Sequence, residues 1–177
     1  MNNGITVWKN FLNQEEISLI DNECDKYGWK PWENYYMTPN PGTNVRIFWA
    51  KDMMKSYKVK NLLIDKIENF LGKKIIVDRL FANARSHGQC GNFHTDVPLN
   101  QEGECLTFVY YIHKGWRPEY GGHLIFEIND EIISYWPQYN SSVLFNSKMP
   151  HCVLEPTIHC KEFRMNLSMM FRVKDKL

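Results

Sequence analysis

Three residues of this chain have the types and the order needed to hold one metal ion. His94 and Asp96 are separated by a single residue, and His151 follows in the C-terminal part of the chain. Two imidazoles and one carboxylate can occupy one face of a metal and leave its other positions open, which is typical of mononuclear Fe(II) sites. A His-x-Asp pair alone arises by chance in many sequences, so this prediction depends on what accompanies it.

Arg164 follows the last of these residues and provides a group that such a metal site needs. A planar guanidinium pairs bidentately with a carboxylate. Arg164 could therefore bind one end of a dicarboxylic co-substrate such as 2-oxoglutarate while the other end reaches the metal.

The composition predicts one globular domain without a dominant charge. The chain has 177 residues, of which 44% are hydrophobic and 14% aromatic, enough apolar material for a single core. Its 21 Lys and Arg against 20 Asp and Glu give a formal charge of +1, which does not indicate a nucleic-acid binder. Because we find neither a membrane-length apolar run nor a signal-peptide pattern, we expect a cytoplasmic protein. The five cysteines lack Cys-x-x-Cys spacing and predict neither a disulfide framework nor a zinc site.

Two amphipathic helices are predicted ahead of the metal motif. Asn13 followed by Glu16 is a capping pattern, and apolar residues recur at helical spacing from there towards Gly28. A second helix is expected from about Met54 to Leu71, with Gly72 as its C-terminal stop.

The stretch between these helices, Pro31 to Asn44, is rich in Pro, Asn, Gly and aromatic residues. It predicts a long loop, either a lid over a site or a packed surface loop. After the second helix the chain becomes β-rich, with segments separated by Gly, Pro and Asn. The expected strands are Ile75–Ala84, Cys105–His113, His123–Ile128, Ser142–Asn146 and Phe163–Val173.

This order predicts an α+β fold in which the helices pack on one face of a rolled antiparallel sheet. We expect a single domain over residues 1–177, with helical support at about 12–72 and a β core at about 75–174. Side chains alternate along a strand, so Arg164, Asn166 and Ser168 share one face of the last strand. An arginine that faces inward needs an anionic partner, because an isolated buried charge is very costly.

Longer strings around these residues resemble a known family. The chain is similar to the 2-oxoglutarate and Fe(II)-dependent dioxygenases, and specifically to the prolyl 4-hydroxylase-like branch that includes the hypoxia-inducible-factor prolyl hydroxylases. The resemblance covers roughly the C-terminal half to three-fifths of the chain. The strings that carry it are Gly88 ahead of His94-Thr95-Asp96-Val97-Pro98, the run Cys105–Trp116, Gly121-Gly122-His123-Leu124, Pro150–Pro156 and Arg164.

The resemblance implies a double-stranded β-helix core, also called a jelly-roll or cupin-like fold, and a role for each matching residue. The iron ligands would be His94, Asp96 and His151. The residues that contact 2-oxoglutarate would be Arg164, Tyr111, Ser168 and Asn83.

The sequence departs from that branch at two places, and both concern the predicted contacts with 2-oxoglutarate. Where the prolyl hydroxylases usually have a tyrosine on the strand before the motif, this chain reads Asn83-Ala84-Arg85-Ser86. The interval from His151 to Arg164 is also longer than is common in the branch, which makes Lys161 an alternative basic anchor. We favour Arg164, because it opens a strand with apolar alternation whereas Lys161 lies in an expected turn.

The resemblance implies an enzyme that uses Fe(II), 2-oxoglutarate and O2, with ascorbate as a reductant in vitro. The leading hypothesis is hydroxylation of a peptidyl residue, proline above all, with release of succinate and CO2. A protein or peptide partner is then expected, a nucleic acid or membrane partner is not, and the oligomeric state stays open. One alternative is the same chemistry on alkylated nucleic-acid bases, whose repair dioxygenases end similarly to Arg164-x-Asn166-Leu167-Ser168, or on a small molecule. Another is a binding protein without turnover.

Overall fold

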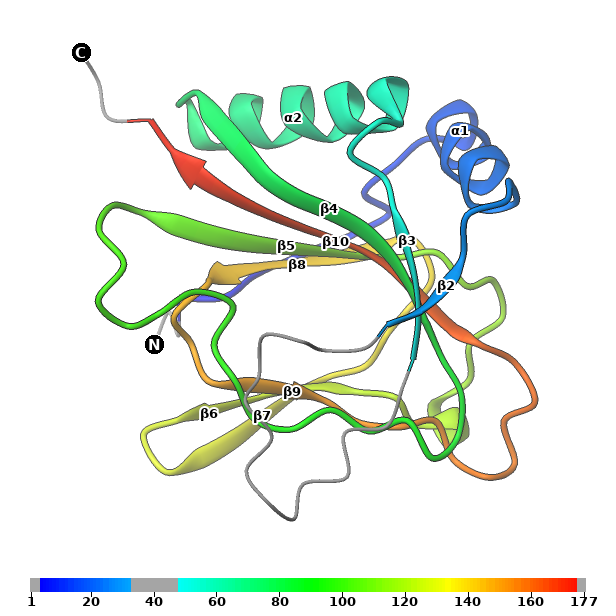
Figure 1. Cartoon of the computed structure of the whole chain (residues 1–177). Helices are drawn as coiled ribbons and strands as arrows, with labels where there is room; N and C mark the ends of the chain where they lie inside the picture. Colours follow the sequence, from blue (N-terminus) through cyan, green and yellow to red (C-terminus); the bar gives the residue numbers. More distant parts are fainter. Residues whose placement is uncertain (1–3, 33–47, 175–177) are drawn as a thin grey trace.

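Two antiparallel sheets and two helices make up the computed structural model, which describes residues 4–32 and 48–174. The larger sheet has the strand order β1-β8-β5-β10-β4-β3-β2, and the smaller one has the order β7-β6-β9. Figure 1 shows both helices on the outer side of the larger sheet, with the smaller sheet facing its other side. The helices are α1 (Gln14–Cys24) and α2 (Tyr57–Leu71). The strands are β1 (Thr6–Lys9), β2 (Lys30–Trp32), β3 (Phe48–Asp52), β4 (Ile75–Arg85), β5 (Cys105–Tyr111), β6 (Leu124–Ile128), β7 (Glu131–Tyr135), β8 (Ser141–Asn146), β9 (His151–Val153) and β10 (Arg164–Val173).

The predicted α+β fold is therefore confirmed, and the start of α1 and the end of α2 follow the predicted signals. The first helix was expected to continue towards Gly28, but α1 ends at Cys24. The Asn13 side chain accepts from the Glu16 amide at 3.0 Å, and the Glu16 carboxylate accepts from the Asn13 amide at 2.8 Å. Gly72 ends α2 in the left-handed conformation, with φ 64°. The second helix begins at Tyr57 rather than Met54, because the Met54 amide first donates to the Asp52 carboxylate in a turn.

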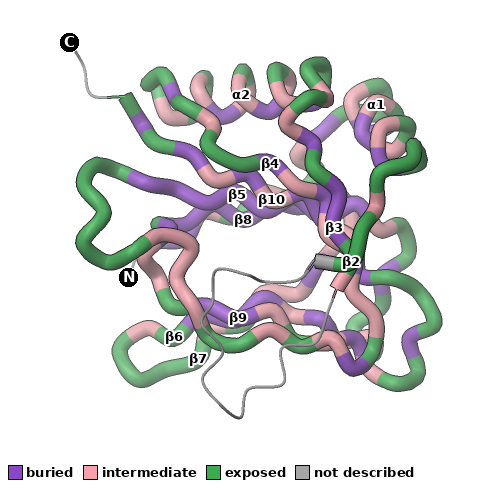
Figure 2. The backbone as a smooth tube through the Cα atoms, in the orientation of Figure 1, coloured by how far each residue is buried: buried purple, intermediate pink, exposed green. Residues whose placement is uncertain are grey.

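Alternation along the strands divides the interior into two apolar clusters. The side chains of β10 that pack against the helices are Leu167, Met169, Phe171 and Val173. The side chains of β10 that line a cavity between the two sheets are Arg164, Asn166, Ser168 and Met170. A smaller cluster around Phe126 and Phe145 fills the rest of the space between the sheets. Figure 2 shows the buried residues concentrated in the strands and on the sheet-facing sides of the helices.

Five strands were not predicted from the sequence. They are β1, β2, β3, β7 and β9, each of three to five residues. Such short segments show little periodicity and become strands only by pairing with longer neighbours. The first two residues of the expected loop from Pro31 to Asn44, Pro31 and Trp32, belong to β2, and the remainder of that loop lies outside the described residues.

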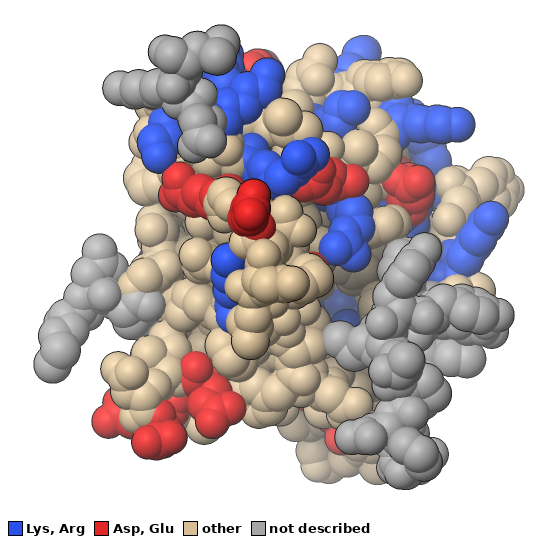
Figure 3. Space-filling view, turned by 60° about the vertical axis from the view of Figure 1, so that its left-hand side comes forward, with Lys and Arg blue, Asp and Glu red and all other residues tan. Residues whose placement is uncertain are grey.

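Oppositely charged side chains lie beside one another on the surface. Lys73 pairs with Glu104 at 3.0 Å, and Arg172 pairs with Asp78 at 2.8 Å. Figure 3 shows one face of the molecule, on which Lys and Arg side chains neighbour Asp and Glu. Neither α1 nor α2 is long and apolar enough to cross a membrane.

One buried amide ties the N-terminal segment to the sheet. The Asn140 side chain accepts from the Leu12 amide at 3.0 Å and donates to the Leu12 carbonyl at 2.9 Å. The side-chain oxygen of Asn140 also accepts from the Tyr110 hydroxyl at 3.2 Å. Residues that are distant in sequence are thus joined by three buried hydrogen bonds, just before α1 begins.

Removing this amide should destabilise the whole fold. We expect Asn140→Gly to lower the free energy of unfolding by about 2–4 kcal/mol, because it leaves buried groups unpaired. Glycine is chosen because Asn140 has φ 54°, a conformation that glycine adopts without strain. Urea denaturation measures the change, and Gln101→Ala at an exposed position is the control, with an expected change within about 0.5 kcal/mol. Equal stabilities of the two variants would contradict the role given to Asn140.

Candidate metal centre

A reciprocal pair of backbone hydrogen bonds places His94 beside His151. The His94 amide donates to the His151 carbonyl at 2.9 Å, and the His151 amide donates back at 3.0 Å. The two residues form an isolated antiparallel bridge at the start of β9. Their imidazole centroids consequently lie 4.4 Å apart.

The orientation of both imidazoles suits metal binding. Nδ1 of His94 lies 2.8 Å from the Asn92 carbonyl, and Nδ1 of His151 lies 2.9 Å from the Met149 carbonyl. A carbonyl can only accept, so Nδ1 carries the proton in both rings and Nε2 keeps a free lone pair. Burial lowers the pKa of His151, which favours the neutral, ligating form of its ring, although Asp96 opposes the shift.

Asp96 is held against both histidines. Its carboxylate oxygens lie 3.7 Å from Nε2 of His94 and 3.6 Å from Nε2 of His151. The Thr107 hydroxyl lies 2.7 Å from the Asp96 carboxylate and 2.8 Å from the Ser147 hydroxyl, while the Asp96 amide donates to the Ser147 carbonyl at 2.8 Å. The carboxylate is therefore fixed by β5 and by the turn after β8, not by its own loop alone.

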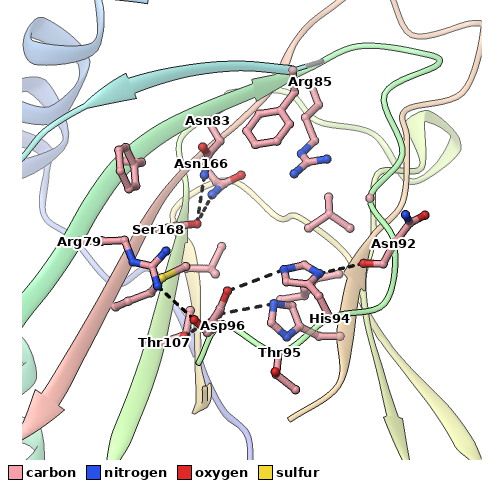
Figure 4. Close-up of a pocket in the computed structure, with 18 of the residues that line it drawn as sticks. Arg79, Asn83, Arg85, Asn92, His94, Thr95, Asp96, Thr107, Asn166 and Ser168 are labelled. Atoms are coloured by element: carbon pink, nitrogen blue, oxygen red, sulfur yellow. Dashed lines mark hydrogen bonds and ion pairs between the residues drawn. The ribbon is translucent and has the colours of Figure 1, made fainter. Parts of the chain in front are cut away.

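These three donors fit one metal ion. All of their ligand atoms lie within 4.8 Å of one another, and an ion roughly 2.0–2.2 Å from each donor can span the gaps of 3.6 and 3.7 Å. Each histidine has a carbonyl partner on its second nitrogen and the carboxylate has a hydroxyl partner, as is usual behind metal ligands. The donors face a cavity of about 820 Å³, shown in Figure 4, so open coordination positions would point into free space.

Arg164 forms a positively charged wall of the same cavity. It is 1% exposed, its Nε donates to the Gly122 carbonyl and its Nη1 donates to the Asn166 side chain at 2.7 Å. Its Nη2 and the nearby Tyr111 hydroxyl are buried atoms without a hydrogen-bond partner among the described residues. The Arg164 guanidinium carbon lies 5.2 Å from the centre of the Tyr111 ring. Two unpaired donors side by side in a buried position suit a carboxylate of a bound acid.

Gly122 makes room for the Arg164 side chain. A Cβ atom at this position would lie 2.9 Å from Cδ of Arg164 and 3.3 Å from the Trp116 ring. Its φ of +72° is also one that other residues rarely adopt. The Gly-Gly string of the sequence therefore has a structural reason beyond a turn at the entry of β6.

The structure brings most of the predicted site residues together. Figure 4 shows Asn83 and Asn166 pointing towards Ser168 on the wall opposite the histidines, and Asn83 donates to the Ser168 hydroxyl at 3.2 Å. Tyr111 is buried beside Arg164, at the edge of the described cavity lining, and Lys161 is exposed and lies outside the cavity. Of the two basic anchors considered, the structure therefore places Arg164 at the site.

Sequence reasoning missed four residues that shape this site. The Thr107 hydroxyl contacts the Asp96 carboxylate, and Gly122 leaves space for the Arg164 side chain. Arg79 and Arg85 line the cavity. The departure from the branch around Arg85 was visible in the sequence, whereas Thr107 stood there only within the matching run Cys105–Trp116. No signal in the sequence indicated that Arg79 reaches the cavity.

The sequence pattern of the 2OG-Fe(II) oxygenase superfamily matches residues 80–172, more than half of the chain. The chain belongs to this superfamily. The protein is accordingly a 2-oxoglutarate- and Fe(II)-dependent oxygenase, and its two histidines and one aspartate are the donor set that such an iron uses. No curated protein matches the sequence.

Solved structures share the fold at low sequence identity. A prolyl-4-hydroxylase from Pseudomonas putida has a TM-score of 0.68 and 20% identity over 97% of this chain and 94% of its own. A prolyl hydroxylase from Trichoplax adhaerens, in complex with a peptide of the hypoxia-inducible factor, has a TM-score of 0.71 and 17% identity over 98% and 84%. HygX from Streptomyces hygroscopicus, with nickel, 2-oxoglutarate and hygromycin B bound, has a TM-score of 0.69 and 9% identity over 96% and 82%. These likenesses confirm the double-stranded β-helix core.

Loss of the Thr107 hydroxyl should weaken metal binding. We expect Thr107→Val to raise the dissociation constant for Mn(II) by about 10–100-fold, because the Asp96 carboxylate loses the donor that orients it. Titration followed by electron paramagnetic resonance measures free Mn(II). Thr107→Ser keeps the hydroxyl and is the matched control. If the valine variant binds Mn(II) as tightly as the serine variant, the hydroxyl does not support the ligand.

Proposed function

We propose that this protein hydroxylates a peptidyl residue, with proline as the first candidate, and releases succinate and CO2. The observation that carries the proposal is a complete set of donors in one cavity: three metal ligands on one side and the buried Arg164 on the other. The two prolyl hydroxylases among the structural neighbours support the peptidyl substrate, although at 17–20% identity they share only the fold.

The protein's own contribution is to bind and to orient. His94, Asp96 and His151 would hold Fe(II), which together with 2-oxoglutarate and O2 supplies the oxidation of a C–H bond. Nη2 of Arg164 and the Tyr111 hydroxyl would donate to the distal carboxylate of 2-oxoglutarate. Burial raises the pKa of Tyr111, which keeps its hydroxyl protonated and able to donate. Ser168 and Asn83 line the space between these two ends.

The reaction is tested by its products. With Fe(II), 2-oxoglutarate and ascorbate, the protein should form succinate, and His94→Ala and Asp96→Ala should lose at least about 99% of this activity. Mass spectrometry of a proline-containing peptide library should then find a gain of one oxygen in some members. Equal succinate formation by the wild type and both variants would refute the enzymatic role of the site.

A small molecule is the second candidate substrate. The observation that favours it is the likeness to HygX, whose solved structure contains hygromycin B and whose TM-score of 0.69 is close to those of the prolyl hydroxylases. A one-oxygen gain in small metabolites, with none in the peptide library, would select this candidate.

Substitution of Gly122 should weaken the binding of 2-oxoglutarate. A methyl group there collides with Cδ of Arg164, so we expect Gly122→Ala to raise the dissociation constant of 2-oxoglutarate by about tenfold or more, a loss of about 1.4 kcal/mol. Isothermal titration of the Mn(II)-loaded protein measures it. Gly115→Ala is the matched control, because Gly115 also has a positive φ but nothing lies within 4 Å of its added Cβ. An unchanged constant in Gly122→Ala would show that the arginine tolerates the methyl group or does not bind the acid.

A further inference from the structure

A second arginine faces the cavity directly beside Arg164. In the antiparallel ladder of β4 and β10, Arg85 is the partner of Arg164. Both side chains line the cavity, and like charges directly opposite one another on neighbouring strands are destabilising. Figure 4 shows Arg85 pointing into the cavity on the side of His94 and Asn92. This pairing calls for an anion.

The contacts of Arg85 with the described part of the chain leave most of its N–H donors without a partner there. Its guanidinium stacks on the Phe48 ring at 3.9 Å and donates one long hydrogen bond, 3.4 Å, to the Gln89 carbonyl. A guanidinium has five N–H donors. Burial, and then repulsion from Arg164, lowers the pKa of Arg85 to about 10, and none of the described residues that influence it is a carboxylate. The group is still charged at neutral pH, and its position is unfavourable without a ligand.

Positive charge is in excess among the described residues that line the cavity. These residues include three arginines, Arg79, Arg85 and Arg164, and a single carboxylate, Asp96. The charge of a divalent metal cancels that of the 2-oxoglutarate dianion. The excess of positive charge in the lining therefore remains after both have bound. Arg79 lies on the opposite side from Arg85 and donates to the Asp96 backbone carbonyl at 3.1 Å. On the surface, by contrast, Arg172 has its own carboxylate partner.

We propose that the substrate of this site carries a carboxylate that binds to Arg85, with Arg79 as a second cation across the cavity. The proposal rests on the proposed function and adds a substrate class to it. A planar carboxylate matches the fork of a guanidinium already stacked on an aromatic ring. The carboxylate belongs either to an Asp or Glu side chain near the target residue or to the free end of a short substrate. Arginines within a cavity, on a chain with a formal charge of +1, favour such an acid over the phosphates of a nucleic acid.

Affinity selection with matched peptide pools tests this inference without turnover. The wild-type protein, loaded with Mn(II) and 2-oxoglutarate, is offered N-acetylated and C-amidated pentapeptides with a central proline. One pool has Asp or Glu beside the proline and the other has Asn or Gln. A third pool is neutral but has a free C-terminal carboxylate, and a single-stranded oligonucleotide is offered separately. Mass spectrometry measures how much of each is retained.

We expect the Asp/Glu pool, the pool with a free C-terminal carboxylate, or both, to be retained about tenfold more than the neutral, amidated pool. Whichever of the two is retained identifies the source of the carboxylate. In Arg85→Gln this ratio should fall to about one, and in Arg85→Glu it should invert in favour of a pool with Lys beside the proline. Arg172→Gln is the matched control, since it removes an arginine of the same sheet outside the cavity and should leave the ratio unchanged.

Several outcomes overturn the inference. They are equal retention of the acidic and neutral pools, retention of none, retention of the oligonucleotide instead of the peptides, and a wild-type ratio in Arg85→Gln. Succinate formation separates the two claims: a protein that forms succinate but shows no preference for a carboxylate refutes only this inference. A protein that forms no succinate refutes the proposed function.

Discussion

The metal centre depends on two backbone hydrogen bonds, those that His94 and His151 exchange. They join a loop residue to the first residue of a three-residue strand, and this strand is itself held by β6. Because backbone groups make the pairing, the two residues are held side by side independently of their side chains. Contacts with Thr107 and Ser147 then hold Asp96 against the two rings.

The second constraint is the burial of Arg164. A buried guanidinium is costly unless its donors are paired, and here one carbonyl and one side-chain oxygen take two of them. Within residues 4–32 and 48–174, Nη2 of Arg164 and the Tyr111 hydroxyl have no hydrogen-bond partner. Buried donors without a partner lower the stability of the protein, but they can interact strongly with a bound acid. Such a compromise is common at binding sites.

Much of the fold and of the site was predictable from the sequence, because both depend on local patterns. The cap at Asn13, the stop at Gly72 and the alternation of β10 are properties of neighbouring residues. They predicted the two helices and the common face of Arg164, Asn166 and Ser168, which the structure places towards the cavity. The rest depends on tertiary contacts. The pairing of His94 with His151 and the position of Arg79 follow from how distant segments pack, which no local pattern encodes.

The buried Asn140 has a consequence for the boundaries of the oxygenase unit. Its amide joins Leu12 to Tyr110, and α1 and α2 cover the same apolar face from which β5 and β10 support the cavity. Opening the N-terminal segment would therefore expose the back of the sheet whose front carries the site. We infer that the chain folds and unfolds cooperatively as one unit. Residue 80 then marks where the superfamily becomes recognisable in the sequence, and it does not mark the start of a part that would fold alone.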